Sequence, residues 1–294
     1  MQHVGSVRLT PGRVRPYVAG VSVRDADLLR VELDGGRRRD RLDVHYQPIM
    51  DLLAGELVAV EALARWHHPT RGLLAAAEVV PLAEGLGLVR ELDLRVLARA
   101  CRQVAEWQGV AASGNPLRAS VNLAASHAAR PDFADGVRAT IEQSGLDPSL
   151  VILELGRGLA EPTLDSLAAR NSLQVLRDHG VRIALSDLGA AGGTLRGLGE
   201  LPVDVLKLDR GVVADLQTNP HAATVAEAVL RLGQQLRLDT IATGIEDPHQ
   251  AAQLAMLGYA TGQGYHFARP MRGDQVRNLL TLNSVVSGLA GIRA

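Results

Sequence analysis

Short strand-like segments alternate with amphipathic helical segments from residue 42 onward. The expected strands cover residues 43–49, 57–66, 117–124, 151–156, 182–187, 205–209, 240–246 and 259–267. The expected helices cover residues 88–108, 133–145, 167–180, 221–237, 247–258 and 271–289. Strands that are separated by helices pair in parallel, because each helix carries the chain back to the start of the next strand. This alternation restricts the chain to the α/β class.

The first two expected strands depart from the alternation. Only residues 50–56 separate them, which is too short a connection for a crossover helix, so we expect them to pair antiparallel. Eight strands in about 250 residues fit a closed barrel better than an open doubly wound sheet. No G-x-G-x-x-G follows the first parallel strand, which also weakens a dinucleotide-binding fold. The sequence therefore predicts a TIM-like (β/α)8 barrel with one antiparallel strand.

Residues 1–41 differ from the rest of the chain. They mix arginine, proline and glycine with one short helical stretch near residues 25–33. We interpret residues 1–41 as an N-terminal arm and a first helix without a recognisable domain. Residues 42–294, including the C-terminal helix, then form the barrel domain.

Composition excludes several classes of partner. The formal net charge is -1 and aromatic residues make up 3% of the chain, so the basic surface and the stacking side chains of nucleic-acid-binding proteins are missing. The single cysteine, Cys101, excludes an internal disulfide and suits a reducing compartment. No apolar run reaches the roughly 18 residues of a membrane span. We expect a cytoplasmic protein that binds neither DNA nor membranes.

Lysine is nearly absent from this chain. Lys207 is the only lysine among 31 basic residues, all the others being arginine. Genomic base composition explains the excess of arginine but not the exception, for which chance is the alternative explanation. A compact ammonium fits between carboxylates or beside a water where the planar guanidinium of arginine does not. Lys207 is therefore a candidate for a functional site.

Polar side chains lie near the ends of seven expected strands. They are Glu61, Asn122, Glu154, Asp187, Lys207, Glu246 and Gln263. In a TIM barrel the carboxyl ends of the strands meet at one rim. Carboxylate and amide oxygens suit Mg²⁺, Mn²⁺ or Ca²⁺, and an ammonium beside them suits a phosphate or an activated water. Each residue alone is explained as well by a helix cap or an ion pair, but the seven together favour a functional site.

Several motifs resemble those of the EAL domain family, which hydrolyses the bacterial second messenger cyclic di-GMP. They are YQP at 46–48, EAL at 61–63, VNLA at 121–124, LELG at 153–156, LKLD at 206–209, GIE at 244–246 and GQGYHFARP at 262–270. They occur in the order and spacing of the family. The resemblance implies a TIM-like barrel with Mg²⁺ or Mn²⁺ at the strand ends, which cleaves one phosphodiester bond to give the linear dinucleotide.

The resemblance also implies roles for single residues. The metal ligands correspond to Glu61, Asn122, Glu154 and Asp187. The catalytic candidates are Lys207, beside the attacking water, and Glu246. The positions that hold the ligand correspond to Gln47, Leu63, Arg65, Asp209, Gln263 and Arg269. His67 and His68 correspond to a Trp-x-His-Pro turn that is typical of the family, and we expect them to be structural.

This sequence departs from the family pattern at charged positions. Ser186 stands where the family has the first of two aspartates, which bridges two metals, and Asp187 is the second. Thr243 and Arg157 replace glutamates, and the loop 188–195 is changed as well. A serine hydroxyl is a poor bridge between two dications. Because loss of one such group commonly costs about 100-fold in rate, we expect little or no hydrolysis.

Three functions remain open from the sequence. The first is a degenerate EAL-type domain that binds cyclic di-GMP, or a protein partner, without appreciable hydrolysis. The second is an active metal-dependent cyclic di-GMP phosphodiesterase with a rearranged site. The third is a nucleotide-independent interaction module, which the changed loop favours because it lies toward the helix that forms dimers in the family. A homodimer and the identity of a protein partner stay open.

Overall fold

The structure is a computed structural model that describes residues 23–33, 41–110, 116–156, 166–189, 198 and 201–290. The strands are β1 (Leu42–Asp51), β2 (Leu57–His68), β3 (Gly72–Ala75), β4 (Arg118–Leu123), β5 (Val151–Leu155), β6 (Arg182–Leu188), β7 (Val205–Leu208), β8 (Asp239–Thr243) and β9 (Thr261–Gln263). The helices are α1 (Val23–Leu33), α2 (Ala76–Leu86), α3 (Val89–Trp107), α4 (Ala125–Ala128), α5 (Phe133–Ser144), α6 (Leu167–Asp178), α7 (Arg210–Asp215), α8 (Pro220–Leu236), α9 (Pro248–Leu257) and α10 (Gly273–Ala290). A short 3₁₀ helix covers Pro148–Leu150.

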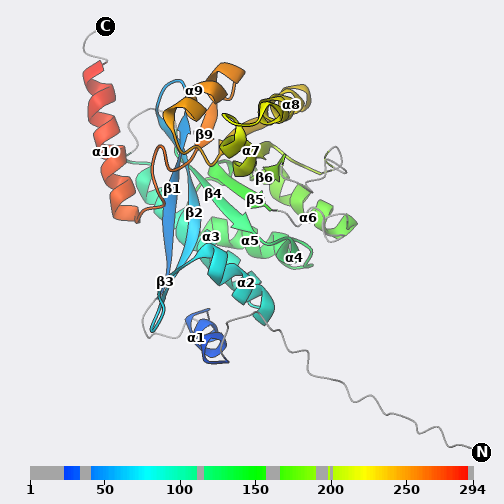
Figure 1. Ribbon diagram of the computed structural model, residues 1–294. Coiled ribbons are helices and arrows are strands. Elements are labelled where there is room, and N and C mark those ends of the chain that lie inside the picture. Colours follow the sequence, from blue (N-terminus) through cyan, green and yellow to red (C-terminus); the bar gives the residue numbers. More distant parts are fainter. Residues whose placement is uncertain are drawn as a thin grey trace, which may run out of the picture.

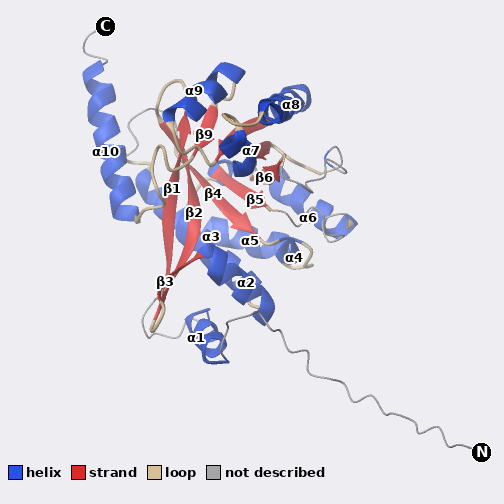
Figure 2. Cartoon of the chain, viewed as in Figure 1, coloured by secondary structure: helices blue, strands red, loops and turns tan. Residues whose placement is uncertain are grey.

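The strands form the predicted barrel. Their order is β1-β9-β8-β7-β6-β5-β4-β2, and pairing of β1 with β2 closes the ring. β1 is antiparallel to both of its neighbours, and the other pairs in the ring are parallel. The helices surround the strands, with α10 beside β1 and α1 near the end of the hairpin that carries β3 (Figures 1 and 2). The predicted fold class and the antiparallel first strand are both confirmed.

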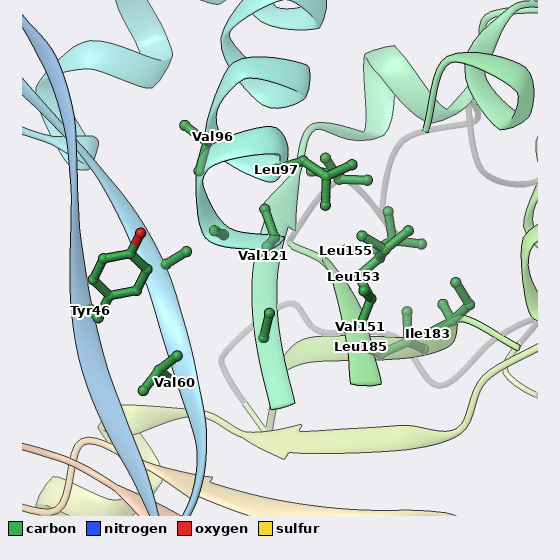
Figure 3. Close-up of a cluster of buried hydrophobic side chains, with 14 of the residues drawn as sticks. Tyr46, Val60, Val96, Leu97, Val121, Val151, Leu153, Leu155, Ile183 and Leu185 are labelled. Atoms are coloured by element: carbon green, nitrogen blue, oxygen red, sulfur yellow. The ribbon is translucent and has the colours of Figure 1, made fainter. Parts of the chain in front are cut away.

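Alternation along the strands separates two cores. Successive side chains of a barrel strand point inward and outward in turn. The outward side chains of β2, β4 and β5, such as Val60, Val121 and Leu153, pack with Val96 and Leu97 of α3 (Figure 3). A separate small cluster fills the inside of the barrel: Ile49, Ala59, Ile152, Ala184, Val205 and Ile241. This inner cluster is an apolar plug on which the rest of the barrel interior rests.

Strand β3 and helices α2, α4 and α7 were not predicted. Strand β3 pairs antiparallel with the end of β2 outside the ring, and α2 follows it directly. Small apolar residues dominate this stretch and Pro81 lies inside α2, so neither a strand pattern nor a helix pattern was visible. The predicted last strand over 259–267 is shorter than expected, because β9 ends at Gln263 and the chain turns at Gly264.

Helix α1 confirms the helical stretch expected near residues 25–33. Its Leu29 is fully buried, and its Asp25 lies 3.0 Å from Nε2 of His68 at the end of β2. His68 Nδ1 accepts hydrogen bonds from the backbone N–H groups of Thr70 and Arg71, so the proton lies on Nε2. His68 thus connects α1 to the turn after β2. Among the helices that the structure describes, none is long and apolar enough to cross a bilayer.

Gly264 lies where two backbone segments touch. The Ile245 N–H donates to the Gln263 carbonyl at 3.1 Å, and the His266 N–H donates to the Ile245 carbonyl at 3.0 Å. A Cβ atom at position 264 would overlap the backbone of Ile245. This contact fixes the segment after β9 against the segment after β8, which carries Glu246.

Replacing Gly264 by alanine is expected to lower the free energy of unfolding by about 3 kcal/mol, because a backbone neighbour cannot move aside as a side chain can. Urea denaturation followed by circular dichroism would measure the loss. Gly109→Ala is the matched control, since nothing lies within 4 Å of a Cβ atom there. Equal effects at the two glycines would contradict the steric explanation.

Candidate functional site

A polar layer lies directly on the apolar plug inside the barrel. On each parallel strand, the next inward side chain after the plug residue lies two positions later in the sequence. On β1, which is antiparallel to its neighbours, it lies two positions earlier. These side chains belong to Gln47, Glu61, Glu154, Ser186, Lys207 and Thr243. Gln263 joins them from β9, where it pairs with Thr243. Strand register alone therefore brings most of the predicted site together.

Lys207 is the centre of this layer. Its Nζ lies 2.6 Å from Glu154 Oε1, 3.3 Å from Glu61 Oε2 and 3.4 Å from Gln263 Oε1. The side chains of Lys207 and Glu154 are each 2% exposed. One buried ammonium thus contacts two carboxylates from β2 and β5. Lys207, the only lysine of the chain, lies where a compact cation fits between carboxylates. This position agrees with the site role that the scarcity of lysine suggested.

Two glutamines extend the network across β1 and β9. Gln263 Nε2 donates to Glu61 Oε2 at 2.6 Å and to Gln47 Oε1 at 3.0 Å. Gln47 Nε2 in turn donates to the backbone carbonyl of Ala268 at 3.2 Å, in the segment that follows β9. Gln47 also faces Glu61 in the antiparallel register of β1 and β2. Both glutamines are buried, so their amide groups are fixed in orientation by these bonds.

Strand β4 contributes two side chains from the same face. Asn122 Nδ2 donates to Glu61 Oε1 at 2.7 Å. Ser120, two residues earlier and fully buried, donates its hydroxyl to Glu154 Oε1. Sequence reasoning identified Asn122 and missed Ser120. The period of two along the strand was the signal, since Ser120 shares the inward face with Asn122.

Burial and charge shift the pKa values of this cluster in different directions. Burial and the Glu61 charge raise the pKa of Glu154, although Lys207 and Ser120 oppose the shift. Burial would also raise the pKa of Glu61, but Lys207 and the hydrogen bonds from Gln263 and Asn122 outweigh it and lower the pKa. Burial disfavours the Lys207 ammonium, yet both carboxylates outweigh it and raise its pKa. Lys207 therefore stays charged at neutral pH.

The predicted metal ligands would suit one hard cation better than two. Glu61, Asn122 and Glu154 supply carboxylate and amide oxygens from three adjacent strands, which suit Mg²⁺ or Mn²⁺. Within the described ranges, no three His, Cys, Asp or Glu side chains come together in a form that could hold a metal ion. A second cation would need a charged bridge, and the inward position at the end of β6 holds the neutral Ser186.

The two substituted positions are occupied by hydroxyl groups that bond to backbone. Thr243 Oγ1 donates to the Leu208 carbonyl at 2.7 Å, and Ser186 Oγ lies 3.5 Å from the Leu155 carbonyl. Asp187, next to Ser186, has a φ of 62°, in the left-handed region that aspartate tolerates better than most residues. Such backbone strain is found mainly at functional sites. The β6–β7 register is also irregular between Leu185 and Leu188.

The remaining predicted residues lie around this layer. Leu63 and Arg65 follow Glu61 on the inward face of β2, and both are half-buried. Arg269 is exposed and lies with its guanidinium carbon 4.4 Å from the centre of the Tyr265 ring. Leu63 and Arg65 thus lie on the strand that holds Glu61, and Arg269 lies in the segment that follows Gln263.

Asp209 and Glu246 make other contacts. Asp209 caps α7, since its side chain accepts from the Gly211 N–H at 2.9 Å. The Glu246 side chain is exposed, and its backbone N–H donates to Gln250 Oε1 at 2.7 Å. Their predicted roles in ligand binding and catalysis stay predictions. Arg157 and residues 190–195 of the changed loop lie outside the described residues.

Comparison with known proteins gives this geometry a family. The EAL domain family matches residues 30–270. The cyclic di-GMP phosphodiesterase NbdA of Pseudomonas aeruginosa is 37% identical over 240 residues, which cover 82% of this chain and 30% of NbdA. The bifunctional diguanylate cyclase/cyclic di-GMP phosphodiesterase MucR of the same organism is 36% identical over 239 residues, which cover 81% of this chain and 34% of MucR. The chain thus spans about a third of the length of these curated relatives.

A solved structure has the same fold with substantial identity. The structure described as the PaMucR phosphodiesterase in complex with c-di-GMP superposes with a TM-score of 0.76 and is 35% identical. The match covers 84% of this chain and 97% of that one. The family match, the sequence relatives and the barrel agree with the motifs around Gln47, Glu61, Asn122, Glu154 and Gln263. The chain belongs to the EAL domain family.

Proposed function

We propose that this chain binds cyclic di-GMP at the polar layer of the barrel and hydrolyses it slowly or not at all. The observation that carries this proposal is the composition of the layer. Gln47, Glu61, Lys207 and Gln263 form one hydrogen-bonded network, whereas the inward positions 186 and 243 hold hydroxyl groups in place of carboxylates. This composition supports ligand binding by groups that are present, and it argues against hydrolysis because the charges that two metals would need are incomplete.

The chain's own residues define what the site does. Arg65 would supply positive charge for a phosphate. Lys207 holds the carboxylates of Glu61 and Glu154 together, and Gln263, itself bonded to Gln47, fixes the orientation of the Glu61 carboxylate. Glu61, Asn122 and Glu154 would hold one Mg²⁺ or Mn²⁺ ion, which supplies charge to neutralise a bound phosphodiester. Without a carboxylate at Ser186 or Thr243, the layer offers little to activate a water for in-line attack. Binding is thereby separated from cleavage.

Calorimetry with cyclic di-GMP and Mg²⁺ tests the proposal, with chromatography of the same samples to detect the linear product. We expect a binding isotherm without appreciable product. Arg65→Ala should weaken binding by about 10-fold or more, because a charge-assisted bond to phosphate is lost. Efficient turnover by the unmodified protein would refute the proposal. Absence of binding even at high ligand concentration would favour a nucleotide-independent interaction module instead.

An active phosphodiesterase is the second candidate, and Asp187 favours it. Asp187, at the end of β6, has a φ of 62°, and backbone strain of this kind clusters at functional sites. In this alternative, Asp187 and Glu246 would compensate for the substituted carboxylates in a single-metal or rearranged site. The expected result is linear dinucleotide in the chromatographic assay, and Glu61→Ala would abolish its formation.

A further inference from the structure

The structure contains a buried histidine–aspartate pair directly behind strand β4. Asp93 of α3 and His127 of α4 are 5% and 1% exposed, and their atoms Oδ2 and Nδ1 lie 3.0 Å apart. The same Oδ2 accepts a hydrogen bond from the backbone N–H of Ala124 at 3.0 Å. The ring of Phe133 packs edge-on against His127, with the centroids 5.0 Å apart. The Oδ2 atom of Asp93 therefore contacts two polar groups of the short turn over residues 124–127, the Ala124 N–H and the His127 ring.

This turn begins two residues after Asn122. On the β2 side, the β4 ladder ends at the pair Ala62–Val121, so the hydrogen bond from Asn122 to Glu61 lies just beyond the last paired residues. Two residues after Asn122 in the sequence, Ala124 is the N-cap of α4. An alanine side chain cannot accept a hydrogen bond, so it cannot cap the helix. The Ala124 carbonyl accepts a hydrogen bond from the backbone N–H of His127, and the Ala124 N–H donates to Oδ2 of Asp93. Asp93 therefore fixes the point at which the chain leaves β4.

We infer that Asp93 is a positioning residue, which acts through Ala124 and His127 to aim the Asn122 amide at Glu61. Strand pairing with β5 fixes the backbone of Asn122 on one side only, opposite Glu154. The anchor at Ala124 removes the remaining freedom of the strand end. The expected effect of Asp93 on cation binding at Glu61, Asn122 and Glu154 rests on the proposed function. Its effect on the orientation of the Asn122 side chain is independent of that function.

A second buried pair in the same protein supplies a matched control. Asp25 and His68 are also separated by 3.0 Å, and their side chains are 11% and 2% exposed. This pair connects α1 to the turn after β2 and has no contact with β4 among the described hydrogen bonds. Loss of either aspartate removes the acceptor of a buried histidine. Only loss of Asp93 also releases Ala124.

The test compares Asp93→Leu, Asp93→Asn and Asp25→Leu in protein labelled with ¹⁵N-asparagine. The side-chain NH₂ signals of Asn122, assigned with Asn122→Ala, report its bond to Glu61 without any metal or nucleotide. We expect Asp93→Leu to move these signals toward those of free asparagine. Asp93→Asn keeps an acceptor and should restore them, and Asp25→Leu should leave them unchanged. Mn²⁺ affinity, measured by electron paramagnetic resonance, should fall about 10-fold in Asp93→Leu alone.

Unchanged Asn122 signals in Asp93→Leu, or equal shifts in Asp25→Leu, would overturn the inference. If Asp93→Leu does not fold, His127→Leu gives the same comparison, with a smaller shift because Ala124 keeps its bond to Asp93. If the unmodified protein binds no Mn²⁺, the proposed metal site fails, while the asparagine signals still decide the role of Asp93.

Discussion

Replacing Lys207 by methionine is expected to lower the free energy of unfolding by about 3–5 kcal/mol near neutral pH. Methionine fills a similar volume, so the main loss is electrostatic. Glu154 and Glu61, held 2.6 and 3.3 Å from the ammonium, would face each other in the barrel without a counter-charge. Removing one partner of a buried ion pair costs more than the pair contributes, because the other partner stays desolvated.

The pH dependence of this loss has a definite sign. In the unmodified protein, the lowered pKa of Glu61 contributes stability above about pH 4.5 that is lost as the pH falls through the folded-state pKa. The raised pKa of Lys207 contributes stability that is fully present below about pH 10.5. Without Lys207, burial and mutual repulsion raise the pKa of both carboxyls. Their contribution then decreases as the pH rises, so the variant should lose more stability at about pH 8 than at about pH 5.

Urea denaturation of both proteins at the two pH values measures the difference. The double variant Lys207→Met, Glu154→Gln is the control, because it removes the uncompensated charge with the ammonium. It should recover much of the lost stability and much of the pH dependence. A loss that is the same at both pH values, or that the second substitution does not relieve, would contradict the electrostatic origin.

The barrel and most of its polar layer were predictable because they follow from strand periodicity. Lys207 and Glu154 occupy inward positions two residues beyond the apolar plug, and Gln263 pairs with Thr243 of the same layer. The antiparallel first strand followed from the short connection over 50–56. Local patterns of this kind depend only on neighbouring residues. Glu61, expected near a strand end, lies in the middle of β2, because β2 continues beyond the barrel ring to pair with β3.

The features that could not be predicted depend on contacts between distant segments. The Asp209 carboxylate caps α7, because the chain turns into a helix directly after it, and its motif gives no sign of this contact. Strand β3 exists because β2 extends beyond the barrel ring and offers a free edge to the following residues. The period of two places Ser120 on the inward face of β4 with Asn122, but its partner Glu154 comes from β5 and is not visible in the local sequence. None of these partners is visible from local sequence.

Restoring charge to the barrel tests whether the substitutions at Ser186 and Thr243 separate binding from cleavage. The double variant Ser186→Asp, Thr243→Glu is expected to raise the turnover of cyclic di-GMP by about 100-fold or more, measured by chromatography with saturating Mg²⁺. Ser186 and Thr243 lie on the inward faces of β6 and β8 in the layer that holds Glu61 and Lys207. Carboxylates there would provide a charged bridge for a second cation and a base for the attacking water. The bond from Thr243 to the Leu208 carbonyl would be lost, which costs only about 1 kcal/mol of stability.

The neutral variant Ser186→Asn, Thr243→Gln separates charge from size. It matches the restored carboxylates in shape and should leave turnover at the level of the unmodified protein. Adding Glu61→Ala to the charged variant should abolish the gained activity, because the cation that the new carboxylates would share loses a ligand from β2. Binding of cyclic di-GMP through Gln47, Arg65 and Gln263 should persist in both double variants. If the charged variant binds the ligand yet gains no activity, the block to hydrolysis lies elsewhere, and Arg157 becomes the next position to revert to glutamate.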